Sequence, residues 1–123
     1  MMKVDIYVTV TKKEEKSECT AILFCKGNTR EVHTIEETHN LAALAGINSA
    51  LKKLIKPCEV HIHIDNMYIK SAVKNGWPQK WRDNEWKKAD GKEPEYVDEW
   101  KKLLTMIELH QITFEKGIKN EEK

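Results

Sequence analysis

The sequence of 123 residues has few cysteines, and their arrangement excludes two common ways of stabilising a small domain. Cys19, Cys25 and Cys58 are odd in number and lack the close CxxC spacing of a zinc ribbon or the even pairing of a disulfide framework. We therefore interpret them as small core residues, and we expect the protein to be located in the reducing cytoplasm.

Long apolar runs and a strong net charge are also missing. No segment approaches the roughly 20 apolar residues that a membrane helix needs. The start, MMKVDIYVTV, carries Lys3 and Asp5, so we expect neither a signal peptide nor a membrane partner. The formal net charge is only +1, so a local basic patch would have to attract any nucleic-acid partner.

The hydrophobic pattern predicts an α/β domain. Period-two alternation predicts strands over residues 4–10, 19–26, 30–36, 59–65 and 111–116. Helical spacing predicts helices over residues 39–56, 66–75 and 96–110, with a further helix and a loop in 77–90.

Short turns make the first three strands an antiparallel meander, and a helical crossover should bring the fourth strand parallel to the first. We therefore expect a five-stranded mixed sheet, antiparallel in strands 1–3 and then parallel in strands 4 and 5, with flanking helices. A single domain should span residues 1–118, and residues 119–123 should form a frayed tail.

The stretch HIHID, residues 61–65, has the His-x-His-x-Asp spacing that some zinc hydrolases use to hold their metal. On a strand His61 and His63 would share one face, but Asp65 lies past the strand's end and the other histidines are scattered. A zinc hydrolase using His61, His63 and Asp65 is therefore a minor alternative. The main interpretation is a sheet face with two half-buried histidines, followed by an acid at the start of a helix.

Aromatic and basic residues concentrate in WPQKWRDNEWKK, residues 77–88. Between Lys70 and Lys92 there are seven Lys or Arg and three Asp or Glu, a local charge of +4. Such a basic, aromatic protrusion is a candidate clamp for a nucleic-acid backbone. The alternative is that the tryptophans form a satellite core and the lysines are solvated, and the residues alone leave both open.

Several segments together resemble the type 1 ribonuclease H family. HIDNMYI resembles the end of that family's fourth strand, THNLAALAGINSAL its first long helix, and GWPQKWRDNEWKKADGKE its basic handle. VDIYVTV resembles the first strand, and YVDEWKKL and HQITFEKG resemble the next helix and the last strand. The resemblance implies a ribonuclease H-like fold, and its most specific part runs from Asn40 to Trp100.

The family cleaves the RNA strand of RNA–DNA hybrids with two Mg²⁺ ions held by four carboxylates. Carried onto this sequence, one catalytic position is Asp65, the strand position is Thr9 and the helix position is Ala43. The helix with the fourth acid is expected to be missing, and the family's loop histidine falls at Gly117 and Ile118. One carboxylate cannot offset the repulsion of two divalent ions. The resemblance therefore implies no required cofactor and at most weak Mg²⁺ or Mn²⁺ binding by Asp65.

The resemblance also implies a nucleic-acid surface of polar turn residues and a basic handle. Its members here are Thr38, His39, Asn40, Asn66, Met67, Trp77, Lys80, Trp81, Lys87 and Lys88. Glu95 and Tyr96 depart from the pattern, because relatives place lysine and asparagine there against a phosphate. Recognition of this kind uses the minor groove, 2′-hydroxyls and phosphates rather than base edges.

The leading hypothesis is a divergent, nuclease-inactive relative that binds an RNA–DNA hybrid or duplex, or that serves as a scaffold. The alternative from another class is an active Mg²⁺- or Mn²⁺-dependent ribonuclease H whose site is rebuilt from nearby acids. Without a final helix part of the sheet would be less covered, so we expect a homodimer or a protein partner to cover it.

Overall fold

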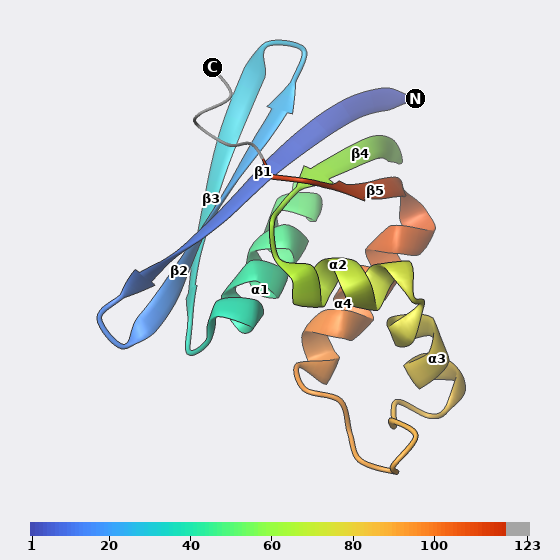
Figure 1. Cartoon of the computed structure of the whole chain (residues 1–123). Coiled ribbons are helices and arrows are strands. Elements are labelled where there is room, and N and C mark those ends of the chain that lie inside the picture. Colours follow the sequence, from blue (N-terminus) through green and yellow to red (C-terminus); the bar gives the residue numbers. More distant parts are fainter. Residues whose placement is uncertain (118–123) are drawn as a thin grey trace.

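The computed structural model describes residues 1–117, which form a sheet with helices on one side (Figure 1). In chain order the elements are β1 (Met2–Lys13), β2 (Lys16–Cys25), β3 (Asn28–Glu36), α1 (His39–Leu51), β4 (Cys58–His63), α2 (Met67–Lys74), α3 (Trp77–Asp83), α4 (Val97–Leu109) and β5 (Gln111–Glu115). Among the described residues no helix is long and apolar enough to cross a membrane. Ile118 and the predicted tail, residues 119–123, lie outside the described residues.

The strand order β3-β2-β1-β4-β5 confirms the predicted mixed sheet. β1 pairs antiparallel with β2, and β2 pairs antiparallel with β3. After the α1 crossover β4 lies parallel to β1, and β5 lies parallel to β4. In this register Val4 pairs with Val60 and Val60 with Ile112, so apolar side chains of three strands share the face that the helices cover.

One core lies between the sheet and the helices, and it follows from the two periodicities. Ile6 and Ile62 are fully buried on the sheet side, and Leu44 and Ile47 are fully buried on α1. Trp100 of α4 is also fully buried, and it packs against the same cluster. Burying a large apolar side chain contributes roughly 1.5–3 kcal/mol, so these residues account for much of the stability of the domain.

The three cysteines are free thiols. Cys19 and Cys58 are buried in the core and Cys25 is half-buried, as expected for small core residues. Burial raises the pKa of the Cys19 thiol to about 11, so this thiol stays protonated at neutral pH.

The hairpin of β1 and β2 is longer than the sequence predicts. The charged stretch KKEEKS, residues 12–17, is expected to be a turn, whereas only Glu14 and Glu15 lie between the two strands. Glu14 adopts a positive φ of 53°, as two-residue hairpin turns require. Lys13 and Glu18 form an ion pair of 3.3 Å across the strands, so opposite charges stabilise pairing near the tip.

α1 is shorter than predicted, because it ends at Leu51 although the apolar spacing continues to residue 56. The N–H of Leu54 donates to the carbonyl of Leu51 at 3.1 Å, three residues back, which tightens the chain after the helix. Pro57 disfavours a helical conformation for the residue before it, so the chain leaves the helical path and enters β4.

α1 packs so closely on the sheet that Gly46 has no room for a side chain. A Cβ atom there would lie 2.3 Å from Cys19 Sγ on β2 and 3.3 Å from Thr34 Oγ1 on β3. The usual preference of helices for alanine over glycine, about 1 kcal/mol, is therefore outweighed by the contact with the sheet.

Gly46→Ala should destabilise the protein by about 1–3 kcal/mol, because overpacking forces the backbone or Cys19 to move. Urea unfolding measures the change. Since Cys19→Ala removes the Sγ atom, Gly46→Ala should cost less in that background. Ser49→Ala, a helix-favouring change at a half-buried position of α1, is the matched control and should cost little. If Gly46→Ala lowers the free energy of unfolding equally with Cys19 and with Cys19→Ala, the contact between Gly46 and Cys19 does not limit the packing.

Candidate functional site

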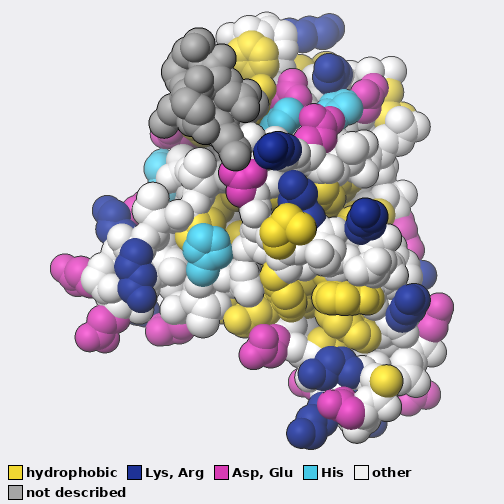
Figure 2. Space-filling model, in the orientation of Figure 1, with side chains coloured by type: hydrophobic (Ala, Val, Ile, Leu, Met, Phe, Trp, Pro, Cys, Tyr) yellow, Lys and Arg dark blue, Asp and Glu magenta, His cyan; other side chains and the backbone are white. Residues whose placement is uncertain are grey.

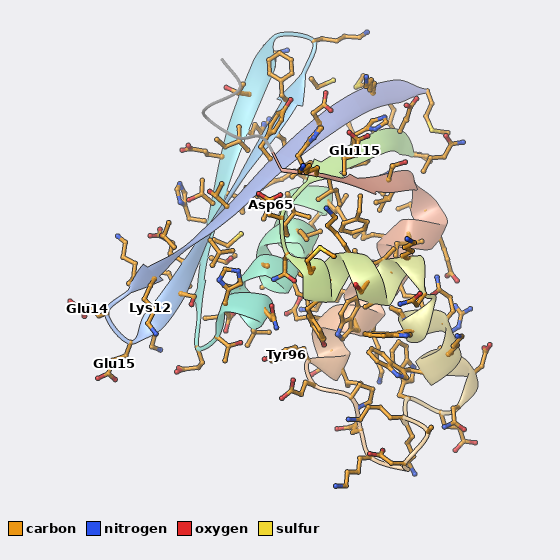
Figure 3. All side chains as sticks on the ribbon, in the orientation of Figure 1. Lys12, Glu14, Glu15, Asp65, Tyr96 and Glu115 are labelled. Atoms are coloured by element: carbon orange, nitrogen blue, oxygen red, sulfur yellow. The ribbon has the colours of Figure 1, made fainter. Side chains whose placement is uncertain are left out.

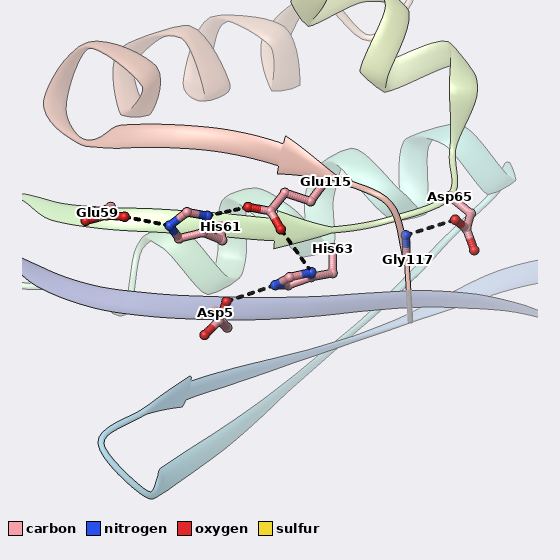
Figure 4. Close-up of polar contacts among 7 residues, drawn as sticks. All are labelled: Asp5, Glu59, His61, His63, Asp65, Glu115 and Gly117. Carbon is pink, nitrogen blue, oxygen red and sulfur yellow. Dashed lines mark hydrogen bonds and ion pairs between the residues drawn. The ribbon is translucent and has the colours of Figure 1, made fainter. Parts of the chain in front are cut away.

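Asp65 lies just beyond β4, where the ends of β4 and β5 meet (Figure 4). Its Oδ1 accepts a hydrogen bond of 2.9 Å from the backbone N–H of Gly117, two residues beyond β5. A Cβ atom on Gly117 would lie 2.7 Å from Asp65 Oδ2, so the carboxylate packs directly on the glycine. Part of the hydrogen-bonding capacity of this acid is therefore used to hold two chain segments together.

A hollow of about 380 Å³ opens beside Asp65, between β1 and the start of α1. Its lining is Val8, Thr9, Val10, His39, Ile64, Asp65 and Asn66. The hollow thus brings together Thr9, His39, Asp65 and Asn66, which the sequence assigns to the site although they lie far apart along the chain. Within the described part of the chain, Asp65 is the only acidic residue of this lining.

Two asparagines fix the helix starts beside the hollow. Asn66 caps α2, since its Oδ1 accepts a hydrogen bond of 2.9 Å from the N–H of Ile69. Its Nδ2 donates to Asn40 Oδ1 at 2.7 Å, which joins the first turn of α1 to the start of α2. With its oxygen engaged in this way, the Asn40 side chain presents amide donors to a ligand.

Thr38 is the N-cap of α1. Its Oγ1 accepts a hydrogen bond of 3.2 Å from the N–H of Leu41 and lies 3.1 Å from the Tyr96 hydroxyl. Tyr96 immediately precedes α4 and has a positive φ of 60°. The contact therefore ties the loop before α4 to the start of α1, and it engages the Thr38 hydroxyl within the protein.

The geometry contradicts the zinc interpretation of HIHID. His61 and His63 point to the sheet face away from the helices, where each lies between carboxylates (Figure 4). Asp65 instead bonds to Gly117 at the end of the sheet. Across residues 1–117, no group of three or more His, Cys, Asp or Glu is arranged to hold a metal ion. Alternation fails at Asp65 because the strand ends at His63.

The family model for RNase H matches residues 3–119. The chain belongs to the ribonuclease H family. The match spans the sheet, the helices and the hollow beside Asp65, so it agrees with the resemblance of the separate sequence segments.

Relatives in this family are similar over most of the chain. The ribonuclease H of Chlorobium phaeobacteroides is 39% identical over 98 residues, which cover 78% of this chain and 67% of that protein. The ribonuclease H of Thermoanaerobacter pseudethanolicus is 38% identical over 96 residues, which cover 76% and 62% respectively. The chain thus spans about two thirds of the length of the curated relatives it matches.

Solved ribonuclease H structures share the fold at lower identity. The crystal structure of LC9-RNase H1, a type 1 RNase H with the type 2 active-site motif, has a TM-score of 0.76 and 17% identity, and the match covers 98% of this chain and 64% of that chain. LC11-RNase H1 in complex with RNA/DNA hybrid has a TM-score of 0.64 and 19% identity, with coverage of 97% and 87%. These likenesses confirm the ribonuclease H-like fold.

In this ribonuclease H relative, two positions that the resemblance assigns to metal-binding acids carry neutral side chains. Thr9 is exposed on β1 and lines the hollow with an uncharged hydroxyl. Ala43 is 0% exposed within the core, so no ligand from that position reaches the hollow. Asp65 is the single retained acid of the three assigned positions that the structure describes.

The tryptophans of the handle pack at one end of the ribonuclease H core. Trp77 lies 6.3 Å from Trp81, and Trp81 meets Trp100 edge-on at 5.8 Å, both measured between ring centroids. The Lys101 ammonium lies 5.6 Å from the ring centroid of Trp86. The rings form the satellite core expected under the alternative interpretation, and Trp77 and Trp81 also keep partly exposed surfaces.

The lysines of the handle remain available to a ligand. Lys80, Lys87 and Lys88 are exposed, and within the described range none of them pairs with a carboxylate. Met67, at the start of α2, is 66% exposed. Figure 2 shows dark blue Lys and Arg side chains around a yellow hydrophobic area over the helices. Figure 3 shows that the tip of the β1–β2 hairpin, labelled at Lys12, Glu14 and Glu15, projects away from Asp65.

A larger hollow, of about 610 Å³, lies at the opposite end of the sheet from Asp65. It is lined by the start of β1, the end of β2 and the turn between α1 and β4, with Met2, Cys25 and Leu54 among its members. None of the site residues assigned from the sequence lines it. Size alone is therefore a poor guide to the site in this ribonuclease H fold.

The sequence did not reveal the roles of Gly117 and Tyr96. It marks Gly117 only as the place of an absent histidine, and Tyr96 only as a departure from the family pattern. Their partners Asp65 and Thr38 are 52 and 58 residues away along the chain, so no local pattern indicates either contact. The available signal is a glycine just after the last strand, since glycine permits a close approach to the backbone.

Gly117→Ala should lower the free energy of unfolding by about 1 kcal/mol, because the added methyl group displaces the Asp65 carboxylate from its hydrogen bond. In an Asp65→Ala background the same change should cost much less, since no carboxylate remains to be displaced. Urea unfolding of the four proteins gives the coupling energy. A coupling near zero would show that this contact does not form in solution. Asp65→Asn keeps an acceptor and is the conservative control.

Proposed function

We propose that this member of the ribonuclease H family binds an RNA–DNA hybrid, or a duplex of similar shape, beside Asp65 without cleaving it by a two-metal route. The observation that carries the proposal is the lining of the hollow. Asp65 is the only acid among its described residues, and the other assigned positions hold Thr9 and the buried Ala43.

The electrostatics of two bound Mg²⁺ ions explain why these replacements matter. Two divalent ions about 4 Å apart repel each other by about 4 kcal/mol even in bulk water, and by more in a protein site. Asp65 supplies one negative charge, whereas a threonine hydroxyl and a buried methyl group supply none. The Gly117 N–H also competes for an oxygen of this carboxylate. The donor set at these positions therefore does not fit a two-metal centre.

The remaining groups suit recognition of a duplex backbone. Amide donors from Asn40 and exposed ammonium groups on the handle can bind phosphates and 2′-hydroxyls, which are the groups that identify an A-form-like duplex. Two structures with this fold, LC11-RNase H1 and the foamy viral protease-reverse transcriptase, are complexes with RNA/DNA hybrid. Their likeness in fold supports a ligand of that class for this chain.

A second candidate function is an active ribonuclease H with a rearranged site. It is favoured by the 39% identity to a protein named ribonuclease H and by the retention of Asp65. Mg²⁺ often binds through one or two carboxylates and a substrate phosphate. On this alternative, Asp65 and a phosphate of the bound hybrid together hold one ion.

The sheet face away from the helices is poorly suited to a homodimer interface. Among the described residues that face carries many charged and polar side chains, including Glu18, Glu59 and Glu115, rather than a continuous apolar surface. A scaffold role, like the cytoplasmic location, stays a prediction from the sequence.

Cleavage of a labelled RNA–DNA hybrid distinguishes the two candidates. With Mg²⁺ or Mn²⁺ in large excess over the protein and the hybrid, the protein should leave the hybrid intact but retain it on a filter at low salt. Retention should weaken steeply as salt rises, because binding releases counterions from the phosphates. Cleavage that is lost in Asp65→Asn would instead establish the active alternative. Intact hybrid that is not retained at low salt would remove the binding proposal.

The double change Lys87→Gln and Lys88→Gln should weaken hybrid binding about tenfold and reduce the salt slope by about one for each phosphate contact that is lost. The matched control is Lys53→Gln with Lys56→Gln, which removes the same charge at the far hollow. Fluorescence anisotropy over a salt series measures both quantities. Equal effects of the two double variants would mean that net charge, not the handle, directs binding.

A further inference from the structure

The sheet face away from the helices carries three of the five histidines, and each lies between two carboxylates. The triplets are Glu18–His33–Glu31 on β2 and β3, Asp5–His63–Glu115 across β1, β4 and β5, and Glu59–His61–Glu115 on β4 and β5. Imidazole side chains therefore link neighbouring strands on this face. Neither the candidate site nor the proposed function uses them.

His61 makes the closest contacts of the three. Its Nε2 lies 2.7 Å from Glu59 Oε2, and its Nδ1 forms a second short hydrogen bond with Glu115 Oε2 (Figure 4). A neutral imidazole carries a single N–H, so one of its nitrogens would direct a lone pair at a carboxylate oxygen. When both acids are ionised, only the protonated ring donates to both, so this geometry favours a bound proton on His61.

We propose that His61 is a proton-dependent clasp that holds the edge strand β5 onto β4 through Glu115, and that β5 loosens when this proton is released. β5 has five residues, and among the described strands it pairs with β4 alone, so few backbone hydrogen bonds fix it within residues 1–117. Ile112 and Phe114 pack toward the core, whereas Glu115 faces the clasp on the opposite side. Short edge strands with few contacts belong to the least stable parts of a fold.

Hydrogen bonds also connect the clasp to the candidate site beside Asp65. The carbonyl of Glu115 accepts a hydrogen bond of 3.0 Å from the N–H of Ile64, which directly precedes Asp65. Two residues later Gly117 donates to the Asp65 carboxylate. Loosening of β5 therefore frees the Asp65 oxygen that Gly117 holds, without any change in the residues that line the hollow.

The surroundings of His61 carry an excess of negative charge. The groups that face the clasp are Lys3, Asp5 and Tyr7 on β1, Glu59 and His63 on β4, and Glu115 on β5. Asp5 bonds to His63 at 2.9 Å, and Tyr7 stacks on the His63 ring at 4.5 Å between centroids. The pKa of Tyr7 is raised, chiefly by burial, so this phenol stays neutral and adds no charge.

The direction of the pH effect follows from these contacts. The hydrogen bonds to Glu59 and then to Glu115 raise the pKa of His61 above its ordinary value of 6.5, and burial opposes them less strongly. Because the folded state binds this proton more tightly than the unfolded state, the clasp is fully present below pH 6.5. It is lost as pH rises through the raised pKa of the folded protein.

Amide hydrogen exchange of the full chain tests the clasp directly. After correction for intrinsic rates, protection of the β5 amides should fall by about tenfold between pH 6 and pH 8.5, while β2 amides stay protected. NMR titration of the His61 ring should show a pKa above 6.5. An equal change in amide protection of β5 and β2 with pH, or a His61 pKa at or below 6.5, would overturn the proposal.

Two variants separate the clasp from a general effect of pH. His61→Gln cannot carry the proton, so β5 protection should be low and independent of pH over this range. His33→Gln is the matched control, because His33 lies between Glu18 and Glu31 on β2 and β3, away from β5. It should leave the pH dependence of β5 unchanged. If His61→Gln does not fold, the exchange and titration of the unmodified protein still decide the question.

Discussion

The close contact between α1 and the sheet sets the geometry of everything around it. The small residues Ala42, Ala43, Ala45 and Gly46 are buried on α1, and Gly46 approaches Cys19 more closely than any other residue type allows. This contact holds α1 against the sheet, and the first turn of the same helix carries Asn40, which accepts a hydrogen bond from Asn66. It also encloses Ala43, so the neutral residue at an assigned acid position is part of the helix packing. Ala43, which the resemblance assigns to an acid position, is thus a buried part of the α1 packing.

Much of the fold could be predicted from the sequence, because period-two and helical spacing are local signals that burial imposes on every strand and helix. The length of the β1–β2 hairpin could not be predicted, because the polar and charged residues 12–17 suit both a solvated turn and exposed paired strands. The contact of Asp65 with Gly117 could not be predicted for another reason. Its two partners are 52 residues apart, and only the parallel pairing of β4 and β5 brings them together.

The HIHID motif shows how neighbouring strands decide what a local pattern means. His61 and His63 do share a sheet face, as their spacing predicts, but that face also carries Asp5 and Glu115 from the strands on either side. A metal ligand needs a free nitrogen lone pair, whereas these imidazoles direct their ring nitrogens at carboxylate oxygens. Contacts with carboxylates therefore occupy the ring nitrogens that zinc would need. The carboxylates that oppose a metal site here are the same groups that the proposed proton-dependent contact uses.

The replacement of acids beside Asp65 has a consequence for binding as well as for cleavage. In a two-metal site the ions screen the carboxylates from the phosphates of the nucleic acid. Without those ions, a carboxylate about 5 Å from a phosphate costs roughly 3 kcal/mol at the effective dielectric of a protein surface. Thr9 and Ala43 remove two such repulsions from the hollow, and Gly117 holds the remaining carboxylate of Asp65 against the end of the sheet. On the proposed function, this composition disfavours two-metal chemistry and, for the same electrostatic reason, lets the site accept a phosphate backbone without metal ions.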